Sequence, residues 1–179
     1  MSNSLLNRMI RASRLEVDLY EEVEADTGAT WQAFQAVIIA SLASGLGVGI
    51  LSLRVEGGAS FLGGLAFGLG MSIVGWLAWS LLSYWLGTTI FKGPETSATV
   101  GELMRTIGFS NSPRVLGFFL FIPILGWVIN FIVSIWALVA GVIAVRQALD
   151  FSTMRAIGTC VVGWIIYNVL LSIVTWVVM

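Results

Sequence analysis

The chain has 179 residues, of which 58% are hydrophobic and only 11% are charged, and its net charge is -1. A soluble domain carries about 25% charged residues, so this composition excludes an ordinary soluble domain, and the near-neutral charge gives no reason to expect nucleic acid as a partner. Histidine is absent and Cys160 is the only cysteine, which excludes a disulfide within the chain, a histidine-ligated metal or haem, and a nucleophile–histidine pair.

The distribution of apolar residues predicts an all-α, polytopic membrane protein. A helix that crosses the bilayer needs about 20 mostly apolar residues, and such stretches fill residues 31–179. We expect a five-transmembrane-helix bundle there, with spans at about 31–53, 61–91, 111–126, 127–148 and 155–179. Residues 1–30 are polar and mixed in charge, so they are expected to form a cytoplasmic N-terminal segment rather than a cleavable signal peptide.

In the N-terminal segment, apolar residues recur at steps of three and four, which is typical of one face of an amphipathic helix. They are Leu5, Met9, Ala12, Leu15, Leu19 and Val23. One interpretation is a solvated helix whose apolar stripe lies on the bilayer or packs under the membrane bundle. The other is a docking surface for a partner, which recognises the acidic run 20–26.

The first two spans carry small residues at four-residue steps. The first has Ser41, Gly45 and Gly49, and the second has Gly64 and Gly68. Small residues on one stripe let helix backbones approach closely when lipid removes the hydrophobic drive for association. We therefore predict helix-packing faces inside the bundle, with a dimer face as the alternative for the first stripe. Residues 54–58 are expected to form a short turn between the two spans.

A short helix is predicted over about 99–108, before the third span. Thr99 and Glu102 match a capping box, in which each side chain bonds to the backbone N–H of the other residue at the start of a helix. Leu103 and Ile107 then fall on one face of the helix. This spacing favours an amphipathic helix that lies along the inner membrane surface.

The third and fourth spans form a membrane hairpin that turns at Pro123 and Gly126. It opens at Gly108-Phe109-Ser110-Asn111-Ser112-Pro113, where Pro113 suits a first helical position because its missing N–H would have no partner there anyway. From Pro113 to Gly126 the first limb is only about 21 Å of helix. A limb that enters the membrane halfway is therefore an open alternative.

The last two spans add a further small-residue stripe and one polar pair. Ala137 and Gly141, four residues apart in the fourth span, are expected to pack against a neighbouring helix. Asn130 and Asn168 lie at depths that differ by only a few ångströms, at about 1.5 Å per residue. They are candidates for a buried hydrogen bond between helices, which contributes on the order of 1 kcal/mol in membrane proteins.

Basic residues determine the expected orientation. With five crossings, eight of the nine basic residues lie on one side of the membrane, and Arg54 alone lies on the other. Lys and Arg collect in cytoplasmic loops. The N-terminus is therefore expected to be cytoplasmic and the C-terminus extracytoplasmic.

Charged residues are expected to converge at the inner surface, at the ends of the short helix, the hairpin and the last span. These are Glu102, Arg105, Arg114, Arg146, Asp150 and Arg155. A structural network of opposite charges is one interpretation, and an anionic lipid headgroup bound by Arg114, Arg146 and Arg155 is another. No catalytic residue, metal or cofactor is predicted, since the two carboxylates have no metal ligand or nucleophile nearby. Ionisable residues are not expected at membrane depth, which argues against a proton-coupled transporter.

Four motifs, taken together, resemble the bacterial branch of the Yip family, the five-span membrane proteins that interact with Rab GTPases in eukaryotic secretory membranes. Gly108-Phe109-x-x-x-Pro113 is similar to the Gly-aromatic-x-x-x-Pro signature of the family. The other three are the acidic run 20–26, Gly101-Glu102-Leu103-x-Arg105-Thr106, and Arg146-Gln147-Ala148-Leu149-Asp150-Phe151. The resemblance implies a five-span fold with a cytoplasmic N-terminus and an extracytoplasmic C-terminus.

The resulting hypothesis is a non-enzymatic integral membrane protein of the Yip type, a scaffold or accessory subunit in a bacterial inner membrane. Its expected partners are membrane lipids, other membrane proteins or a second copy of itself. The alternative is a small carrier or channel for a neutral or lipidic substrate, in which the hairpin at Pro123 moves. A continuous polar cavity within the membrane would favour this alternative, whereas a sealed apolar bundle would remove it. An enzyme acting on lipid would need paired acid–base groups in one cleft, which only the inner-surface charges supply.

Overall fold

A computed structural model describes residues 4–53 and 61–178, so the turn expected at residues 54–58 lies outside the described residues. The described part of the chain is helical and contains no strand, which confirms the all-α prediction. The helices are α1 (Leu5–Ser13), α2 (Val17–Ala25), α3 (Ala29–Ser52), α4 (Phe61–Thr89), α5 (Val100–Ser110), the 3-10 helix η1 (Ser112–Phe121), α6 (Leu125–Ala148) and α7 (Thr153–Val178).

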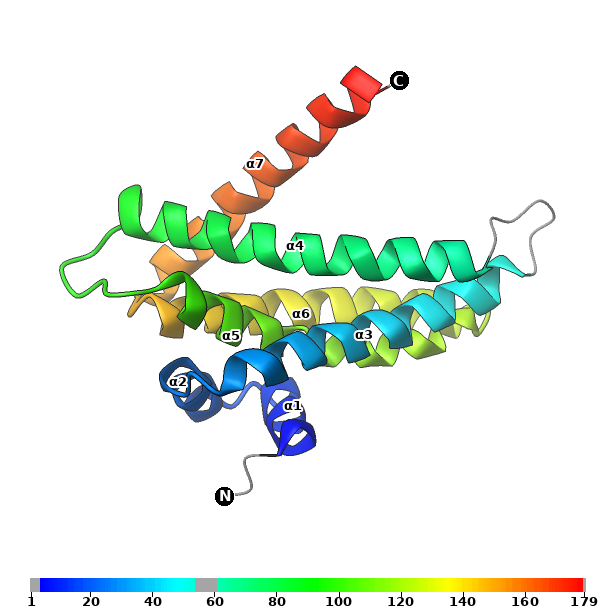
Figure 1. The fold of residues 1–179 in the computed structure, drawn as a ribbon, viewed down its shortest axis with the longest axis horizontal. Helices are drawn as coiled ribbons and strands as arrows, with labels where there is room; N and C mark the ends of the chain where they lie inside the picture. Colours follow the sequence, from blue (N-terminus) through cyan, green and yellow to red (C-terminus); the bar gives the residue numbers. More distant parts are fainter. Residues whose placement is uncertain (1–3, 54–60, 179) are drawn as a thin grey trace.

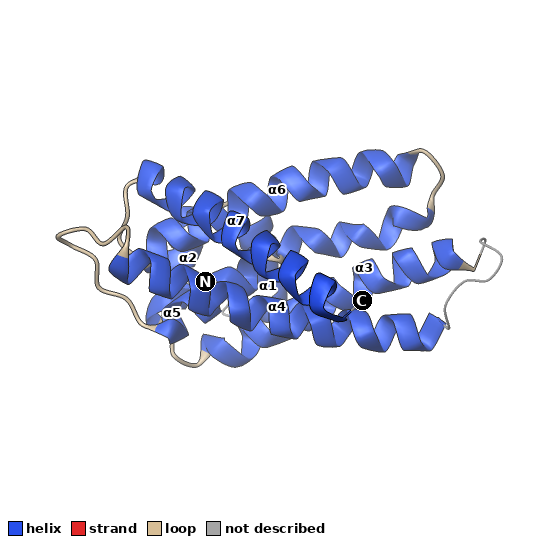
Figure 2. Ribbon diagram, turned by 90° about the horizontal axis from the view of Figure 1, so that it is seen from above, coloured by secondary structure: helices blue, strands red, loops and turns tan. Residues whose placement is uncertain are grey.

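The long helices α3, α4 and α6 lie along the longest axis of the molecule, and α7 leaves the bundle at an angle (Figure 1, Figure 2). Among the described residues, α3, α4 and α6 are the helices long and apolar enough to cross a membrane. Many of their outward-facing side chains are large and apolar, such as Leu62, Phe67 and Phe131. A surface of this kind suits lipid rather than water as its solvent.

The N-terminal segment is two helices rather than the single helix that its periodicity predicts. α1 ends at Ser13, and the chain turns at Leu15, whose φ of 60° lies in the left-handed region. The apolar stripe is buried on both sides of this turn, at Met9, Ala12, Leu19 and Val23. The three- and four-residue steps therefore mark the buried side chains correctly, but these side chains belong to two packed helices.

The pattern of residues 99–108 predicts a helix that lies along the inner membrane surface. In the structure, α5 instead packs inside the helix bundle. Leu103 and Ile107 are buried, and so are the last three residues of α5, Gly108 to Ser110. Trp76 of α4 also donates a hydrogen bond from its indole nitrogen to the carbonyl oxygen of Met104, at 2.9 Å. The amphipathic spacing marks a face that packs against neighbouring helices rather than against the bilayer.

η1 continues the path of α5 along α3. Gly108 of α5 lies against Ala33 of α3, and Gly117 of η1 lies against Ser44, further along the same helix. A 3-10 helix rises about 2.0 Å per residue and an α-helix about 1.5 Å, so α5 and η1 together extend about 36 Å, as far as α6 does. The limb that begins at Pro113 is too short alone to match α6, and α5 supplies the missing length.

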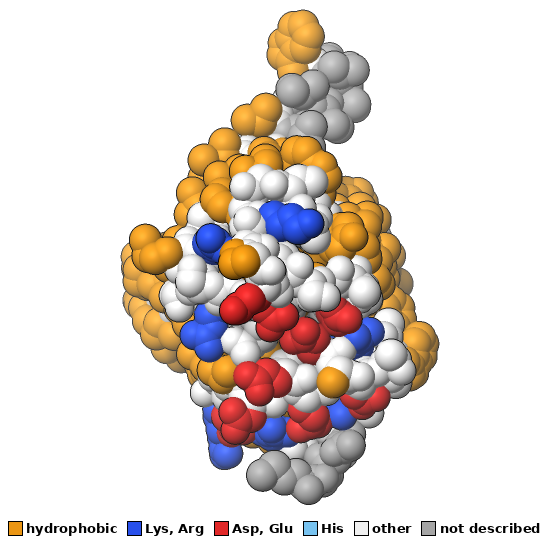
Figure 3. Space-filling view, turned by 90° about the vertical axis from the view of Figure 1, so that its left-hand side faces the viewer, with side chains coloured by type: hydrophobic (Ala, Val, Ile, Leu, Met, Phe, Trp, Pro, Cys, Tyr) orange, Lys and Arg blue, Asp and Glu red, His pale blue; other side chains and the backbone are white. Residues whose placement is uncertain are grey.

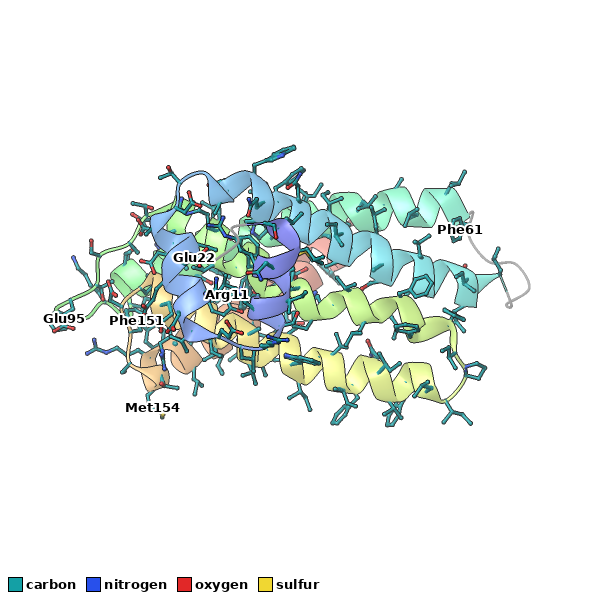
Figure 4. All side chains as sticks on the ribbon, turned by 90° about the horizontal axis from the view of Figure 1, so that it is seen from below. Arg11, Glu22, Phe61, Glu95, Phe151 and Met154 are labelled. Atoms are coloured by element: carbon teal, nitrogen blue, oxygen red, sulfur yellow. The ribbon has the colours of Figure 1, made fainter. Side chains whose placement is uncertain are left out.

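Charged side chains gather at one end of the bundle, which we call the polar end (Figure 3). It comprises α1 and α2, residues 90–99 between α4 and α5, and the turn between α6 and α7. In that turn Asp150 has a φ of 50°, a conformation that Asp tolerates better than most residues. The opposite end of the bundle holds the turn at Pro123 and the start of α4 at Phe61 (Figure 4).

Candidate functional site

Two buried arginines join α1 to α2, and residues 5–25 together form what we call the N-terminal platform. The Arg8 side chain is 1% exposed and donates to Glu22 at 3.0 Å, Asp26 at 2.7 Å and Gln32 at 3.0 Å. Arg11 donates to the second carboxylate oxygen of Glu22 at 2.5 Å (Figure 4). Buried charges are stable only when they are paired and hydrogen-bonded. These bonds therefore fix the platform against the start of α3.

The same bonds set the protonation of the platform carboxylates. Burial alone raises the pKa of Glu22, but the hydrogen bonds from Arg11 and Arg8 outweigh it and lower that pKa. The hydrogen bond from Arg8 also lowers the pKa of Asp26. The contribution of both carboxylates to stability is present above the ordinary pKa of the unfolded chain, and it is lost as the pH falls through the lowered values.

Arg105 connects α5 to the platform through backbone atoms. Its side chain is buried, and its guanidinium donates to the carbonyl oxygen of Val23 at 2.8 Å and to that of Glu24. The last carbonyls of a helix have no partner within the helix and carry a partial negative charge. Arg105 therefore caps the C-terminal end of α2 and joins the platform to the bundle.

The other residues predicted for a charge network have separate contacts. Glu102 forms the predicted capping box with Thr99, whose N–H donates to the Glu102 carboxylate at 2.7 Å. Arg146 donates to Gln147, and Gln147 donates to Glu21 of α2, both at 2.8 Å. All six predicted residues are described, and no ion pair joins Glu102, Arg105, Arg114, Arg146, Asp150 and Arg155. Bonds to helix ends and to amides take the place of the expected network of opposite charges.

A shallow depression lies at the polar end, between residues 90–99 and the turn that joins α6 to α7. Arg146 and Asp150 line it together with Glu95 and Phe151, which Figure 4 shows at this end of the molecule. Arg155 lies over Gly93, where an added Cβ would be 2.0 Å from a guanidinium nitrogen. The depression is open and carries both signs of charge, so it is a solvated surface rather than a closed anion site.

Glu24 gives the platform a pH dependence. Burial, followed by the charges of Asp150, Glu102 and Glu21, raises the pKa of Glu24 to about 7, against the opposing charge of Arg105. The folded protein therefore holds this proton up to about pH 7, whereas the unfolded chain releases it near pH 4.5. Because the folded state binds more protons in this window, folding stability falls as the pH rises through it.

Glu24→Gln is expected to remove the decrease in folding stability between about pH 4.5 and pH 7. The variant lacks the charge that burial disfavours, so at pH 8 it should be more stable by on the order of 1 kcal/mol, after allowance for solvent screening. Thermal unfolding in detergent between pH 5 and pH 8 measures the effect, with Glu95→Gln at an exposed position as the control. A slope of stability against pH that is the same in Glu24→Gln and the parent protein would contradict it.

A groove of about 890 Å³ lies between α3, α4, α6, α7 and the junction of α5 with η1. All seven small residues predicted as helix-packing positions line it, namely Ser41, Gly45, Gly49, Gly64, Gly68, Ala137 and Gly141. A Cβ added at Gly64, Gly68 or Gly141 would meet no neighbouring atom within 4 Å. These three glycines therefore keep the groove open instead of bringing helices together, whereas Gly45 and Gly49 do face side chains of α4.

The sequence pattern places Arg114 with the other charges at the inner surface. In the structure Arg114 lines this groove instead and lies away from the polar end. Its carbonyl oxygen accepts a hydrogen bond from the hydroxyl of Ser44 at 2.8 Å. Ser44 is 15 residues after Ala29, the first residue of α3, which is about 22 Å along the helix axis. Because α5 packs inside the bundle and η1 continues from its end, Arg114 lies along α3 and not at the polar end. The side chain is exposed, and its guanidinium has no hydrogen-bond or ion-pair partner in the described part of the chain.

The asparagine pair predicted between α6 and α7 is not formed. Asn130 is exposed, and Asn168 donates to the carbonyl oxygen of Trp164 in its own helix at 2.7 Å. α7 diverges from the bundle toward its C-terminal end, where Asn168 lies (Figure 1). Similar depth in the membrane therefore does not bring the two side chains together.

A family model described as the Yip1 domain matches residues 17–176. The chain belongs to the Yip1 domain family. No curated protein and no solved structure matches it. The Yip1 domain thus extends from the start of α2 into the last turns of α7, and its apolar helices make the protein an integral membrane protein.

In this Yip1 domain, the residues of the Gly-aromatic-x-x-x-Pro signature pack the junction between α5 and η1. Gly108 lies so close to α3 that an added Cβ would be 2.7 Å from the Cβ of Ala33. Phe109 and Pro113 are fully buried. At the other end of the hairpin, Gly126 is buried, and a Cβ there would lie 2.3 Å from a backbone oxygen of η1. The signature residues therefore have a structural role in this protein.

Gly47 of α3 and Gly117 of η1 form a very close contact of the Yip1 bundle that the spacing of small residues does not predict. A Cβ at Gly47 would lie 2.2 Å from the carbonyl oxygen of Gly117. The four-residue stripe that contains Gly45 marks one face of α3, and Gly47, two residues later, points nearly the opposite way. Gly47, a glycine of α3 outside that stripe, is the sequence signal for this contact.

Proposed function

We propose that this Yip1 protein crosses the membrane five times, through α3, α4, the α5–η1 unit, α6 and α7. Three of these helices have the length and composition of membrane spans, and the α5–η1 unit is as long as α6. The basic residues at the polar end favour a cytoplasmic N-terminus, and an odd number of crossings then makes the C-terminus extracytoplasmic. The resemblance of the motifs to bacterial members of the family supports a bacterial inner membrane as the location.

We propose further that the protein is a non-enzymatic scaffold or accessory subunit that binds other membrane proteins through its polar end. The observation that carries this proposal is the anchored platform, because Arg8 and Arg105 hold α1 and α2 against the bundle as a defined surface. On α2 the exposed charged side chains, Asp18 and Glu21, are both acidic. Glu95 is also exposed at this end, in a loop that carries an exposed basic residue as well, Lys92 (Figure 3). The complementary partner is a basic cytoplasmic segment beside a span of another membrane protein.

Photocrosslinking from the platform tests this proposal. A photoreactive residue at Asp18 of the full-length protein in native membranes is expected to capture one membrane-protein partner. Reversing the charges of Glu21 and Glu95 to lysine should lower the yield several-fold, because like charges would then face each other. The same photoreactive residue at Leu62, on the apolar surface of α4, is the matched control. A chain that elutes alone at one-copy mass, with no capture from position 18, would count against a scaffold.

The groove favours a second candidate function, a small carrier for a lipidic substrate. A sealed apolar bundle would remove this candidate, whereas a groove of about 890 Å³ that Arg114 lines supports the candidate. Reconstituted vesicles with fluorescent phospholipid in both leaflets provide the test. An aqueous quencher should reach the inner-leaflet lipid faster in the presence of the protein, and rates equal to those of protein-free vesicles would exclude the carrier.

A further inference from the structure

We infer that the groove binds one phospholipid with a net negative headgroup, whose phosphate pairs with Arg114 and whose acyl chains lie against the apolar wall. This inference rests on the same groove as the carrier proposal and names the class of its ligand. It requires binding alone, not movement of the lipid across the membrane.

The first step of the argument is the charge of Arg114. A guanidinium does not lose its proton in proteins, and a charged side chain at membrane depth is costly unless it has a counter-charge. The groove is lined by no aspartate or glutamate among the described residues. The Ser44 hydroxyl bonds to the backbone carbonyl of Arg114 and leaves the guanidinium free. The counter-charge must therefore come from the occupant of the groove.

The second step is the chemistry of the remaining wall. From Arg114 the groove extends toward Phe61, which Figure 4 shows at the end of the bundle opposite the polar end. Its sides include Leu65, Val48 and Leu138, and the last two are exposed, so the wall faces the bilayer. A small water-soluble anion would leave this apolar surface uncovered. An amphiphile covers it with its chains and offers its phosphate to the bidentate guanidinium.

The third step separates Arg114 from the other arginines. Arg8, Arg11 and Arg105 already have carboxylate or carbonyl partners, and Arg146 donates to Gln147 at the polar end. Arg114, Arg146 and Arg155, which the sequence suggests as one headgroup site, therefore do not lie together in the structure. Of these arginines Arg114 alone lines the groove, so the site has one cation in a mostly apolar groove that also carries uncharged polar side chains such as Ser41 and Asn111.

Native mass spectrometry of the full-length protein, released from vesicles of equal parts phosphatidylglycerol and phosphatidylcholine, tests the inference. The parent protein is expected to retain one phosphatidylglycerol, and Arg114→Gln should lower that retention at least tenfold. Arg114→Gln keeps the backbone carbonyl that Ser44 binds. Arg155→Gln, which removes an exposed arginine outside the groove, is the matched control and should retain the lipid.

A second variant keeps the test decisive if Arg114→Gln does not fold. Gly68 lines the groove with open space around it, so Gly68→Leu should fill the groove without disturbing helix packing. It is expected to lose the lipid while Arg114 remains. Thermal unfolding curves that match the parent protein show that the variant is folded.

Three results would overturn the inference. One is equal retention of phosphatidylglycerol by the parent protein and a folded Arg114→Gln or Gly68→Leu variant. Another is equal retention of phosphatidylcholine, and the third is displacement of the lipid by inorganic phosphate or glycerol 3-phosphate, which would indicate a site for small anions. Lipid that is retained but does not move in the vesicle assay leaves the inference intact and excludes only the carrier.

Discussion

Gly47→Ala is expected to destabilise the bundle strongly, although it adds only one methyl group. The new Cβ would lie 2.2 Å from the carbonyl oxygen of Gly117 and 2.7 Å from that of Phe118. These are backbone atoms within η1, so they cannot rotate away as a side chain does. Overpacking usually costs 1–3 kcal/mol and occasionally more, and a clash with backbone belongs at the upper end, at about 3 kcal/mol. Unfolding in mixed micelles with increasing dodecyl sulfate measures the loss.

Two further glycines calibrate this prediction. Gly64→Ala should leave stability unchanged or slightly raised, because an added Cβ meets no neighbouring atom and alanine favours a helix by roughly 0.5–1 kcal/mol over glycine. Gly45→Ala should fall between the two, since only the end of the Leu65 side chain, at 2.8 Å, has to move. If all three variants unfold at the same dodecyl sulfate concentration, the close approach of α3 and η1 is wrong.

Arg8→Ala is expected to release the N-terminal platform from the bundle. The side chain is 1% exposed and bonds to two carboxylates and to Gln32. Removing one partner of a buried ion pair costs roughly 3–5 kcal/mol, and the partial exposure of Glu22 and Asp26 places this case near 3 kcal/mol. Because the membrane helices keep their own contacts, the loss should be local. Hydrogen exchange should therefore rise over residues 5–25 and stay unchanged in α6.

Arg14 provides the matched control for Arg8. It lies six residues later at the end of α1, its side chain is 71% exposed, and its nearest carboxylate is 4.0 Å away. An exposed pair of this kind contributes at most about 1 kcal/mol, so Arg14→Ala should exchange like the parent protein. Equal exchange over residues 5–25 in Arg8→Ala and Arg14→Ala would mean that burial of Arg8 does not hold the platform.

The features that the sequence predicts well depend on neighbours along the chain. The capping box of Thr99 and Glu102 forms as predicted because its partners are three residues apart and both backbone donors lie at one helix end. The apolar stretches of α3, α4 and α6 can also be predicted, because the length and composition of a span are properties of consecutive residues. Buried positions in the platform also follow the spacing of Met9, Ala12, Leu19 and Val23.

The features that the sequence misses depend on how separate helices meet. Spacing alone does not distinguish a helix on the bilayer from a helix inside the bundle, so the pattern of α5 supports either position. The depth of Arg114 follows from that choice, because η1 begins where α5 ends. Leu15 is similar: its positive φ breaks the N-terminal helix, yet the periodicity of the stripe continues across the turn. The small residues indicate missing volume correctly, but only the fold shows that the volume is a groove.

The bonds of the platform also imply an order of events during biosynthesis. Arg105 follows Val23 by 82 residues, and Gln147 follows Glu21 by 126. A ribosome adds about 5–20 residues per second, so α2 emerges several seconds before either anchor exists. During that interval the acidic helix has neither of these two anchors. The platform can therefore form all of these bonds only after α6 has been synthesised.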